Sequence, residues 1–185
     1  YKHELLKKWQ LTNFHNPLWA RTNMLSSLAY AGLWLKENPC IVSYSDIFYH
    51  SSAVKSLMEC DSPIAITYDP NWLDIWSKRF VDPLSDAETF SLNANSTIAE
   101  IGNNPSSIAE ISGQYMGLLR ITPEGWDEME RVRAEVSEEV RDKMQITKLL
   151  QLIIGADRMA ITALPFEGEW GEVDTPSDLA LYQAY

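Results

Sequence analysis

Two stretches, Cys40-Ile41-Val42-Ser43-Tyr44-Ser45-Asp46 and Trp170-Gly171-Glu172-Val173-Asp174, each place an aspartate at the end of an apolar run. The first run is continuous, as in a strand that is buried on both faces of a parallel sheet. In an open α/β sheet, ligands bind beyond the carboxyl ends of the strands. Two carboxylates placed there could hold one divalent cation over a bound polyphosphate, although a single aspartate at a strand end more often opens a turn or caps a helix.

Alternating helices and strands are predicted along the chain. A helix is predicted over 25–35 after the start signal Thr22-Asn23, and it leads into the strand at 40–45. The other predicted strands lie at 11–15, 63–68, 114–121, 159–164 and 170–173, and the other helices at 51–60, 126–143, 146–154 and 176–183. Residues 89–93 and 97–101 predict a hairpin. This order favours an α/β fold, with a mainly parallel open sheet, helices on both faces and an inserted β-hairpin.

The composition fits one globular domain over residues 1–185. With 45% hydrophobic and 22% charged residues, the chain can bury a sizeable core. Its net charge of -11, from 26 acidic and 15 basic side chains, argues against a nucleic-acid partner, because binding to a phosphate backbone needs a basic surface. No stretch approaches the ~20 apolar residues of a membrane span, and no signal peptide is visible, so the cytoplasm is the expected location.

The carboxyl-terminal segment Glu172-Val173-Asp174-Thr175-Pro176-Ser177-Asp178-Leu179, together with Tyr44-Ser45-Asp46-Ile47-Phe48, resembles the sugar-phosphate nucleotidyltransferase superfamily. The closest resemblance is to its phosphocholine and phosphonate cytidylyltransferases. Residues 16–28 resemble the family segment that meets the nucleotide, and Glu110 to Leu118 is similar to the strand that walls the acceptor pocket. The resemblance implies a Rossmann-like nucleotidyltransferase fold and an enzyme that uses magnesium, a nucleoside triphosphate, with CTP favoured, and a small phospho-acceptor.

One part of the family pattern has no counterpart in this sequence. The glycine-rich signature, whose Arg and Lys grip the triphosphate, is absent from the chain, which opens at Tyr1-Lys2-His3-Glu4. We therefore expect the nucleotidyltransferase domain to lack its amino-terminal signature segment. The same absence supports a second hypothesis, a non-catalytic nucleotide-binding domain of the same fold.

Nucleotidyl transfer brings two anionic groups together, so cations must neutralise them. The resemblance places Asp46 and Asp174 on the two metal-binding aspartates of the family. A magnesium ion held by them would bridge the α-phosphate and the acceptor oxygens while pyrophosphate leaves. Asn23 and Ser26 are candidates for nucleotide contact, because a helix start beside the nucleotide offers hydrogen-bond donors.

The segment after the strand at 63–68 suggests an acceptor with a positive charge. Trp72 and Trp76 are four residues apart on one predicted helical face, and with Tyr115 they could surround a choline-like cation while Asp69 or Asp74 supplies negative charge. Aromatic pairs at this spacing also occur through packing alone. Acceptors such as phosphocholine or 2-aminoethylphosphonate would suit such a cage, whereas a sugar-1-phosphate would need a pocket richer in hydroxyl-binding residues.

Lys78 or Arg79 could meet the phosphoryl group of the acceptor. Asp86 to Phe90 and Glu100 to Gly102 are alternatives for binding the metal or the acceptor, although turn and hairpin roles suit both segments. The candidate site residues are, for catalysis, Asp46, Asp174 and Lys78; for the nucleotide, Asn23, Ser26 and Ser45; and for the acceptor, Trp72, Trp76, Arg79, Tyr115 and Glu172. The sequence leaves open whether the chain forms a homo-oligomer.

Overall fold

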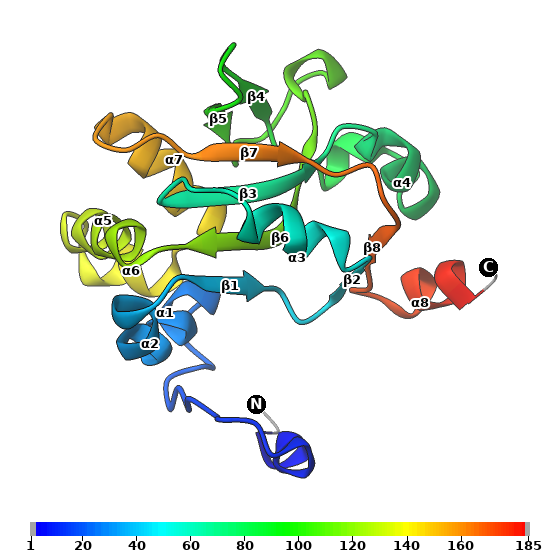
Figure 1. The fold of residues 1–185 in the computed structure, drawn as a ribbon. Helices are drawn as coiled ribbons and strands as arrows, with labels where there is room; N and C mark the ends of the chain where they lie inside the picture. Colours follow the sequence, from blue (N-terminus) through cyan, green and yellow to red (C-terminus); the bar gives the residue numbers. More distant parts are fainter. Residues whose placement is uncertain (1–2, 184–185) are drawn as a thin grey trace.

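Four strands form the central sheet of the computed structural model, which describes residues 3–183 (Figure 1). They are β1 (Cys40–Ser43), β3 (Ile64–Asp69), β6 (Gln114–Ile121) and β7 (Thr162–Pro165), in the order β1-β6-β3-β7. Strands β1, β3 and β7 run in one direction, and β6 lies antiparallel between β1 and β3. The predicted open α/β sheet is confirmed, with one antiparallel strand inside it.

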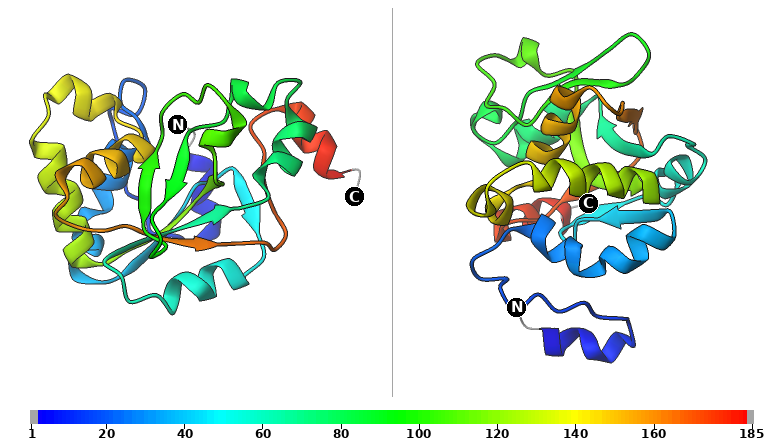
Figure 2. Two further views of the ribbon diagram at one scale, coloured as in Figure 1. Left: turned by 90° about the horizontal axis from the view of Figure 1, so that it is seen from above. Right: turned by 90° about the vertical axis from the view of Figure 1, so that its left-hand side faces the viewer.

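Helices cover both faces of this sheet, as Figure 2 shows. In β3, Ile64 and Ile66 face a core built with α5 (Pro123–Ala134) and α7 (Ile146–Ala156). Ala65, between them, faces a second core built with α3 (Ser52–Met58) and α4 (Trp72–Arg79). Successive side chains of a strand point to opposite faces, so an apolar strand such as β3 supports two cores at once.

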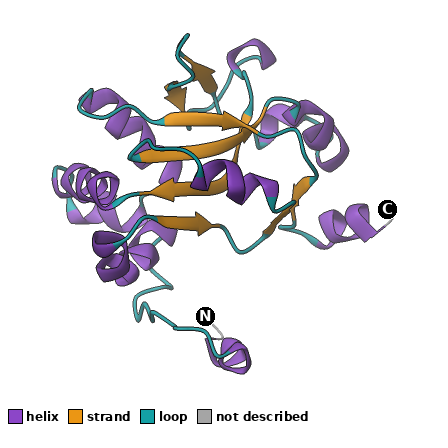
Figure 3. Ribbon diagram, viewed as in Figure 1, coloured by secondary structure: helices purple, strands orange, loops and turns teal. Residues whose placement is uncertain are grey.

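Three predicted elements differ from the structure (Figure 3). The single helix predicted over 126–143 is wrong: α5 ends at Ala134, and α6 (Glu138–Lys143) begins after Ser137, whose hydroxyl accepts the amide of Val140 as an N-cap. The helix predicted over 25–35 is divided by the 3₁₀ turn η2 (Ala29–Ala31). The strand predicted at 11–15 is also wrong, because this segment is an exposed loop without a strand partner among the described residues.

The amino-terminal elements are short. The 3₁₀ helix η1 (His3–Trp9) lies apart from the sheet in Figure 1 and in the right view of Figure 2. Helix α1 (Met24–Leu28) precedes η2, and α2 (Gly32–Glu37) follows it. Asn23 caps α1, as the predicted start signal indicates, because its side chain accepts the amide of Met24.

Two small antiparallel sheets flank the central one. Strands β4 (Phe90–Leu92) and β5 (Ile98–Ile101) form the predicted hairpin. Strands β2 (Ile47–Tyr49) and β8 (Trp170–Glu172) pair with each other, and α8 (Pro176–Gln183) follows β8. The 3₁₀ turns η3 (Pro83–Ser85) and η4 (Ile108–Glu110) complete the described elements. Within residues 3–183, no helix has the length and apolar character needed to cross a membrane.

The start of α5 packs against the start of β3 through backbone atoms. Thr122 caps this helix by accepting the amide of Gly125, and Pro123 occupies its first turn. A Cβ atom on Gly125 would lie only 2.4 Å from the carbonyl oxygen of Pro63 and 2.8 Å from Cγ1 of Ile64. The absence of a side chain at Gly125 therefore sets how closely α5 approaches the sheet.

We predict that Gly125→Ala destabilises the protein by about 1–3 kcal/mol, the usual cost of overpacking, because the backbone of β3 has to move. Gly155→Ala in α7 is the matched control: a Cβ there meets nothing within 4 Å, and alanine should stabilise that helix by up to ~1 kcal/mol. Urea unfolding measures both. Equal stability of Gly125→Ala and the unaltered protein would contradict this account of the packing.

Candidate functional site

The two predicted metal-binding aspartates come together through the pairing of β2 with β8. Asp46 follows β1, and its main-chain oxygen accepts the amide of Val173 at 2.9 Å. The ladder continues with Ile47 opposite Glu172. Asp46 is therefore hydrogen-bonded to the residue directly before Asp174, although the two aspartates lie far apart in the sequence.

The donor atoms at this place suit a hard cation. Asp46 is exposed, and the side chain of Asp174 is 47% exposed. Magnesium is usually bound by one or two carboxylates, with water and substrate phosphates completing its shell. Within residues 3–183, no group of three or more His, Cys, Asp or Glu side chains is arranged to hold a metal. The aspartate pair thus fits an open magnesium site better than a closed protein cage.

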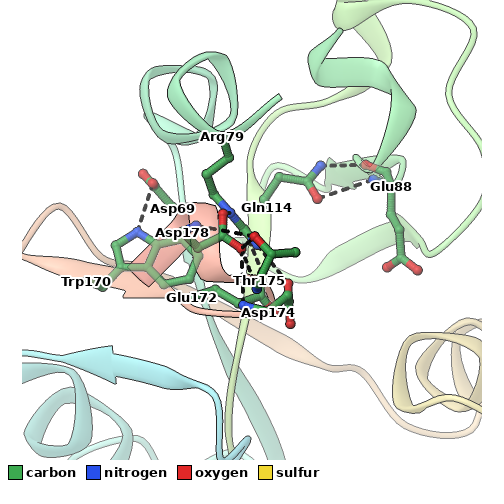
Figure 4. A network of polar contacts seen from close by, with 9 residues as sticks. All are labelled: Asp69, Arg79, Glu88, Gln114, Trp170, Glu172, Asp174, Thr175 and Asp178. Carbon is green, nitrogen blue, oxygen red and sulfur yellow. Dashed lines mark hydrogen bonds and ion pairs between the residues drawn. The ribbon is translucent and has the colours of Figure 1, made fainter. Parts of the chain in front are cut away.

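Arg79, at the end of α4, extends its guanidinium toward three carboxylates, those of Glu172, Asp174 and Asp178 (Figure 4). Its Nη1, Nη2 and Nε atoms bond Glu172 at 2.8 Å, Asp174 at 2.7 Å and Asp178 at 3.0 Å. Burial acts to lower the pKa of Arg79, but these hydrogen bonds outweigh it and raise the pKa. The side chain of Arg79 is fully buried and its donors are paired with carboxylates. It therefore does not contact the phosphoryl group of an acceptor, contrary to the prediction from the sequence.

Asp178 connects Arg79 to the chain that carries Asp174. Its Oδ2 accepts the main-chain amides of Asp174 and Thr175, while its own amide donates to Thr175 Oγ1. This reciprocal arrangement is a capping box at the start of α8. Burial acts to raise the pKa of Asp178, but the bonds from Arg79 and Thr175 outweigh it and lower the pKa.

A cavity of about 250 Å³, which we call the acidic cavity, opens beside Glu172. Its lining combines carboxylates, aromatic rings and neutral polar groups: Met24, Tyr44, Trp76, Asp86, Glu88, Gln114, Tyr115, Gln145, Thr147 and Glu172. Among the described residues, the lining contains no lysine or arginine. Tyr115 Oη is buried and has no hydrogen-bond partner within residues 3–183, whereas the indole N–H of Trp76 interacts with Asp86. The cavity therefore offers negative charge and an unused hydroxyl group to a ligand.

Burial raises the pKa of each carboxyl group in this lining, those of Asp86, Glu88 and Glu172. Glu88 accepts a hydrogen bond from Thr147 at 3.2 Å. At Glu172, the hydrogen bond and the charge of Arg79 lower the pKa and so offset part of the rise caused by burial. These groups are consequently harder to ionise than free carboxyl groups, and a cation in the cavity would favour their charged forms.

Tyr44 stands between the acidic cavity and Asp46. Burial raises the pKa of its hydroxyl, and the carboxylates of Glu88, Glu172 and Asp46 raise it further. Its ring meets Tyr115 edge to face at 5.8 Å. Gly117 makes room for it, because a Cβ at this position would lie 2.8 Å from the Tyr44 ring and the backbone has a φ of +77°.

A second cavity of about 290 Å³ lies on the other side of Tyr44 and includes Ser45 and Asp46. Both cavities are lined by Met24 and Tyr44, so they adjoin each other. Ser45, predicted to contact the nucleotide, lies here. The other two predicted nucleotide residues do not line it: the Asn23 side chain caps α1 and donates to the carbonyl of Lys143, and Ser26 is buried.

Part of the predicted aromatic cage is brought together. Trp76 and Tyr115 both line the acidic cavity. Trp72 does not: it is 3% exposed and packs in the core, with its ring centroid 6.0 Å from that of Trp76. Asp69 is also turned away, because it accepts the indole N–H of Trp170 at 2.9 Å, and Asp74 lies on the exposed side of α4. The prediction that Trp72, Asp69 or Asp74 belongs to the cage is therefore wrong, because none of them lines the acidic cavity.

Lys78 lies on a different side of α4 from the acidic cavity. It lines a separate cavity of about 220 Å³ with Phe48, Ile75, Trp170 and Tyr182. Lys78 therefore lines neither of the two cavities beside Tyr44, where the predicted catalytic role would place it.

The negative charge of the cavity comes largely from the segment 86–88, for which the sequence favoured a turn. Gln114 orients this segment, because its amide accepts from the backbone N–H of Glu88 at 3.2 Å and donates to the Glu88 carbonyl at 2.6 Å (Figure 4). Asp86 and Glu88 are two carboxylates on either side of the buried Ala87, and both line the cavity, so this acidic pair is the signal that the sequence offers. Thr147, at the start of α7, carries no such signal.

We predict that Glu88→Gln raises the thermal midpoint at neutral pH. Since folding raises the pKa of Glu88, the stability linked to this group is fully present below the ordinary glutamate pKa of about 4.3 and is lost as the pH rises through the folded-state pKa. The gain should therefore vanish in melts below about pH 4. Glu37→Gln, at an exposed position in α2, should show no gain at either pH. A lower midpoint for Glu88→Gln at neutral pH would contradict the prediction.

Comparisons with known proteins agree with this architecture. No family model matches the chain. A CTP:phosphoglutamine cytidylyltransferase of Campylobacter jejuni is 30% identical over 186 aligned positions, which cover 94% of this chain and 73% of that protein. The inositol-1-phosphate CTP transferase of T. maritima superposes with a TM-score of 0.73 at 16% identity, over 98% of this chain and 71% of that one.

A Bacillus anthracis protein described as a glucose-1-phosphate thymidylyltransferase superposes with a TM-score of 0.65 at 14% identity. This match covers 89% of the present chain, which spans 61% of the length of that structure. At such identities the two superpositions show a shared fold. The 30% identity to the curated relative also indicates common descent. The chain therefore belongs to the sugar-phosphate nucleotidyltransferase superfamily.

Proposed function

We propose that this protein is a magnesium-dependent cytidylyltransferase. It would transfer the nucleoside monophosphate of CTP to a small phosphorylated or phosphonylated acceptor and release pyrophosphate. The observation that carries the proposal is the position of the acidic cavity, which lies across Tyr44 from a second cavity that contains Asp46. CTP is favoured over other triphosphates because two relatives are described as using it.

Asp46 and Asp174 are the residues that would hold the magnesium ion. When bound, the ion would supply positive charge to the phosphate oxygens of both substrates. The protein itself would contribute orientation: the two cavities would keep nucleotide and acceptor on opposite sides of Tyr44. The acceptor's phosphate or phosphonate oxygen is already ionised, so the residues around it need not remove a proton.

The charge of the acidic cavity favours an acceptor with an ammonium group at the end away from its phosphorus. A lining with three carboxylates and no basic residue would repel a second anion, whereas Glu88 and Asp86 would attract a cation. Trp76 and Tyr115 contribute aromatic rings to the lining, and a ring face open to the cavity would be worth ~0.5 to 2 kcal/mol for a well-placed ammonium. Phosphocholine and 2-aminoethylphosphonate have this chemistry. Phosphoglutamine, the acceptor in the name of the curated relative, also has an ammonium group at that end but carries a carboxylate on the same carbon.

A sugar-1-phosphate acceptor is the second candidate. Gln145 and Thr147 line the same cavity and could bond sugar hydroxyl groups. An assay of pyrophosphate release with CTP and magnesium, run in parallel with phosphocholine, 2-aminoethylphosphonate, phosphoglutamine and glucose-1-phosphate, separates the candidates. Higher kcat/KM for the ammonium acceptors supports the first, and a preference for glucose-1-phosphate supports the second. No release with any of them, across the four common triphosphates, would refute the proposed function.

We predict that Asp46→Asn lowers the rate of pyrophosphate release by about 100-fold or more, because metal charge stabilisation is worth several kcal/mol. The fold should be unaffected, since the Asp46 side chain is exposed and, within residues 3–183, the hydrogen bond at Asp46 is made by its main-chain oxygen. Asp61→Asn, also exposed but in the loop before β3, is the control and should retain full activity. A rate for Asp46→Asn within about twofold of the unaltered protein would argue against the metal site.

We predict that Glu88→Gln raises the KM of an ammonium acceptor roughly 3- to 30-fold, the range that corresponds to ~0.7 to 2 kcal/mol. The KM for CTP should stay nearly constant. This variant preserves side-chain volume, whereas Trp76→Ala would remove a ring packed between Trp72 and Trp170 in the core. An equal rise in KM for glucose-1-phosphate would show that Glu88 does not recognise the ammonium group.

A further inference from the structure

The buried guanidinium of Arg79 has no part in the proposed contacts with nucleotide or acceptor. Its side chain has no exposed surface, and its Cζ lies 5.6 Å from the ring centroid of Trp76 and 5.0 Å from that of Phe80. Burying an arginine is costly unless its donors are paired. Here the pairing partners are three carboxylates, and one of them is Asp174, the candidate metal ligand.

The contacts form a closed ring around the strand end. Arg79 bonds the carboxylate of Asp174 and that of Asp178 through different nitrogen atoms. Asp178 in turn accepts the main-chain amide of Asp174 at 3.2 Å. Asp174 is thus held through its side chain by Arg79 and through its backbone by Asp178. Only the Oδ2 atom of its carboxylate is engaged with Arg79.

An arginine bonded to a metal ligand can have two opposite effects. It can compete with the metal for the carboxylate, or it can hold that carboxylate in the orientation that the metal needs. The exposed side chain of Asp174 could turn into solvent without a partner, and the arginine occupies one of its two oxygen atoms only. We propose that Arg79 is a positioning residue, which orients Asp174, together with Glu172, toward the metal beside Asp46. This inference rests on the proposed metal site.

The variant Arg79→Lys tests this role because it keeps the positive charge but removes the planar fork of donors. The probe is Mn²⁺ alone, titrated into the nucleotide-free protein and followed by electron paramagnetic resonance. Since loss of a residue that orients a metal ligand typically costs 10- to 100-fold in metal affinity, we expect at least about 10-fold weaker binding. Unchanged binding would overturn the positioning role, and tighter binding would also identify Arg79 as a competitor of the metal.

Arg158→Lys is the matched control. Arg158 also pairs with two carboxylates, Glu128 at 2.8 Å and Glu135 at 3.1 Å, but it lines neither of the two cavities beside Tyr44. Its variant should bind Mn²⁺ as the unaltered protein does. An equal loss of affinity in Arg158→Lys would overturn the assignment, because the effect would then be general and not specific to Arg79.

Circular dichroism and a thermal melt establish that each variant is folded. Should Arg79→Lys fail to fold, Asp178→Asn provides the test. This variant preserves side-chain volume and keeps Arg79 bonded to Glu172 and Asp174, but it weakens the closed ring of contacts at Asp178. Weaker Mn²⁺ binding by folded Asp178→Asn supports the ring, and unchanged binding overturns it. If the unaltered protein binds no Mn²⁺, the proposed metal site fails and this assignment with it.

Discussion

Repulsion between carboxylates is the constraint on which the active end of this molecule depends. Glu172, Asp174 and Asp178 share the single guanidinium of Arg79, which leaves an excess of negative charge beside Asp46. Around the acidic cavity, burial makes Asp86 and Glu88 harder to ionise. A protein that gathers so many acidic groups loses stability unless cations complete the site. The proposed magnesium ion and an ammonium group on the acceptor would supply those cations.

The central fold could be predicted from sequence because its strands are continuous apolar runs. Ile64 to Asp69 is buried at every position, and such a run fits only a strand covered on both faces. Strand direction could not be predicted, because β6 has the same apolar character as its neighbours and yet runs antiparallel to them. The break between α5 and α6 was also missed. Ser137 caps a new helix there, and its signal is weaker than the charged helical pattern around it.

The candidate site could be predicted only in part. Asp46 and Asp174 stand out because each follows a strand, and the β2–β8 ladder brings them together. The position of Trp72 could not be inferred from its spacing with Trp76, since both indoles lie on one face of α4 and only the one a turn further along the helix reaches the cavity. The burial of Arg79 was equally hidden. A cationic side chain near a phosphate site suggests substrate contact, but Arg79 instead forms ion pairs with three acidic residues of the segment 172–178.

The two halves of the site are built from different kinds of structure. The half proposed to bind the metal depends on backbone ladders and on a capping box, so its geometry is tied to the fold and tolerates little change. The half proposed to bind the acceptor depends on the 86–88 segment, held by the amide of Gln114, and on Thr147 in the first turn of α7. The side chains of the 86–88 loop can be replaced without disturbing the sheet. A fold of this kind can therefore keep one phosphoryl chemistry while its acceptor changes, and the acidic lining here would select a cation where another chain would select a sugar.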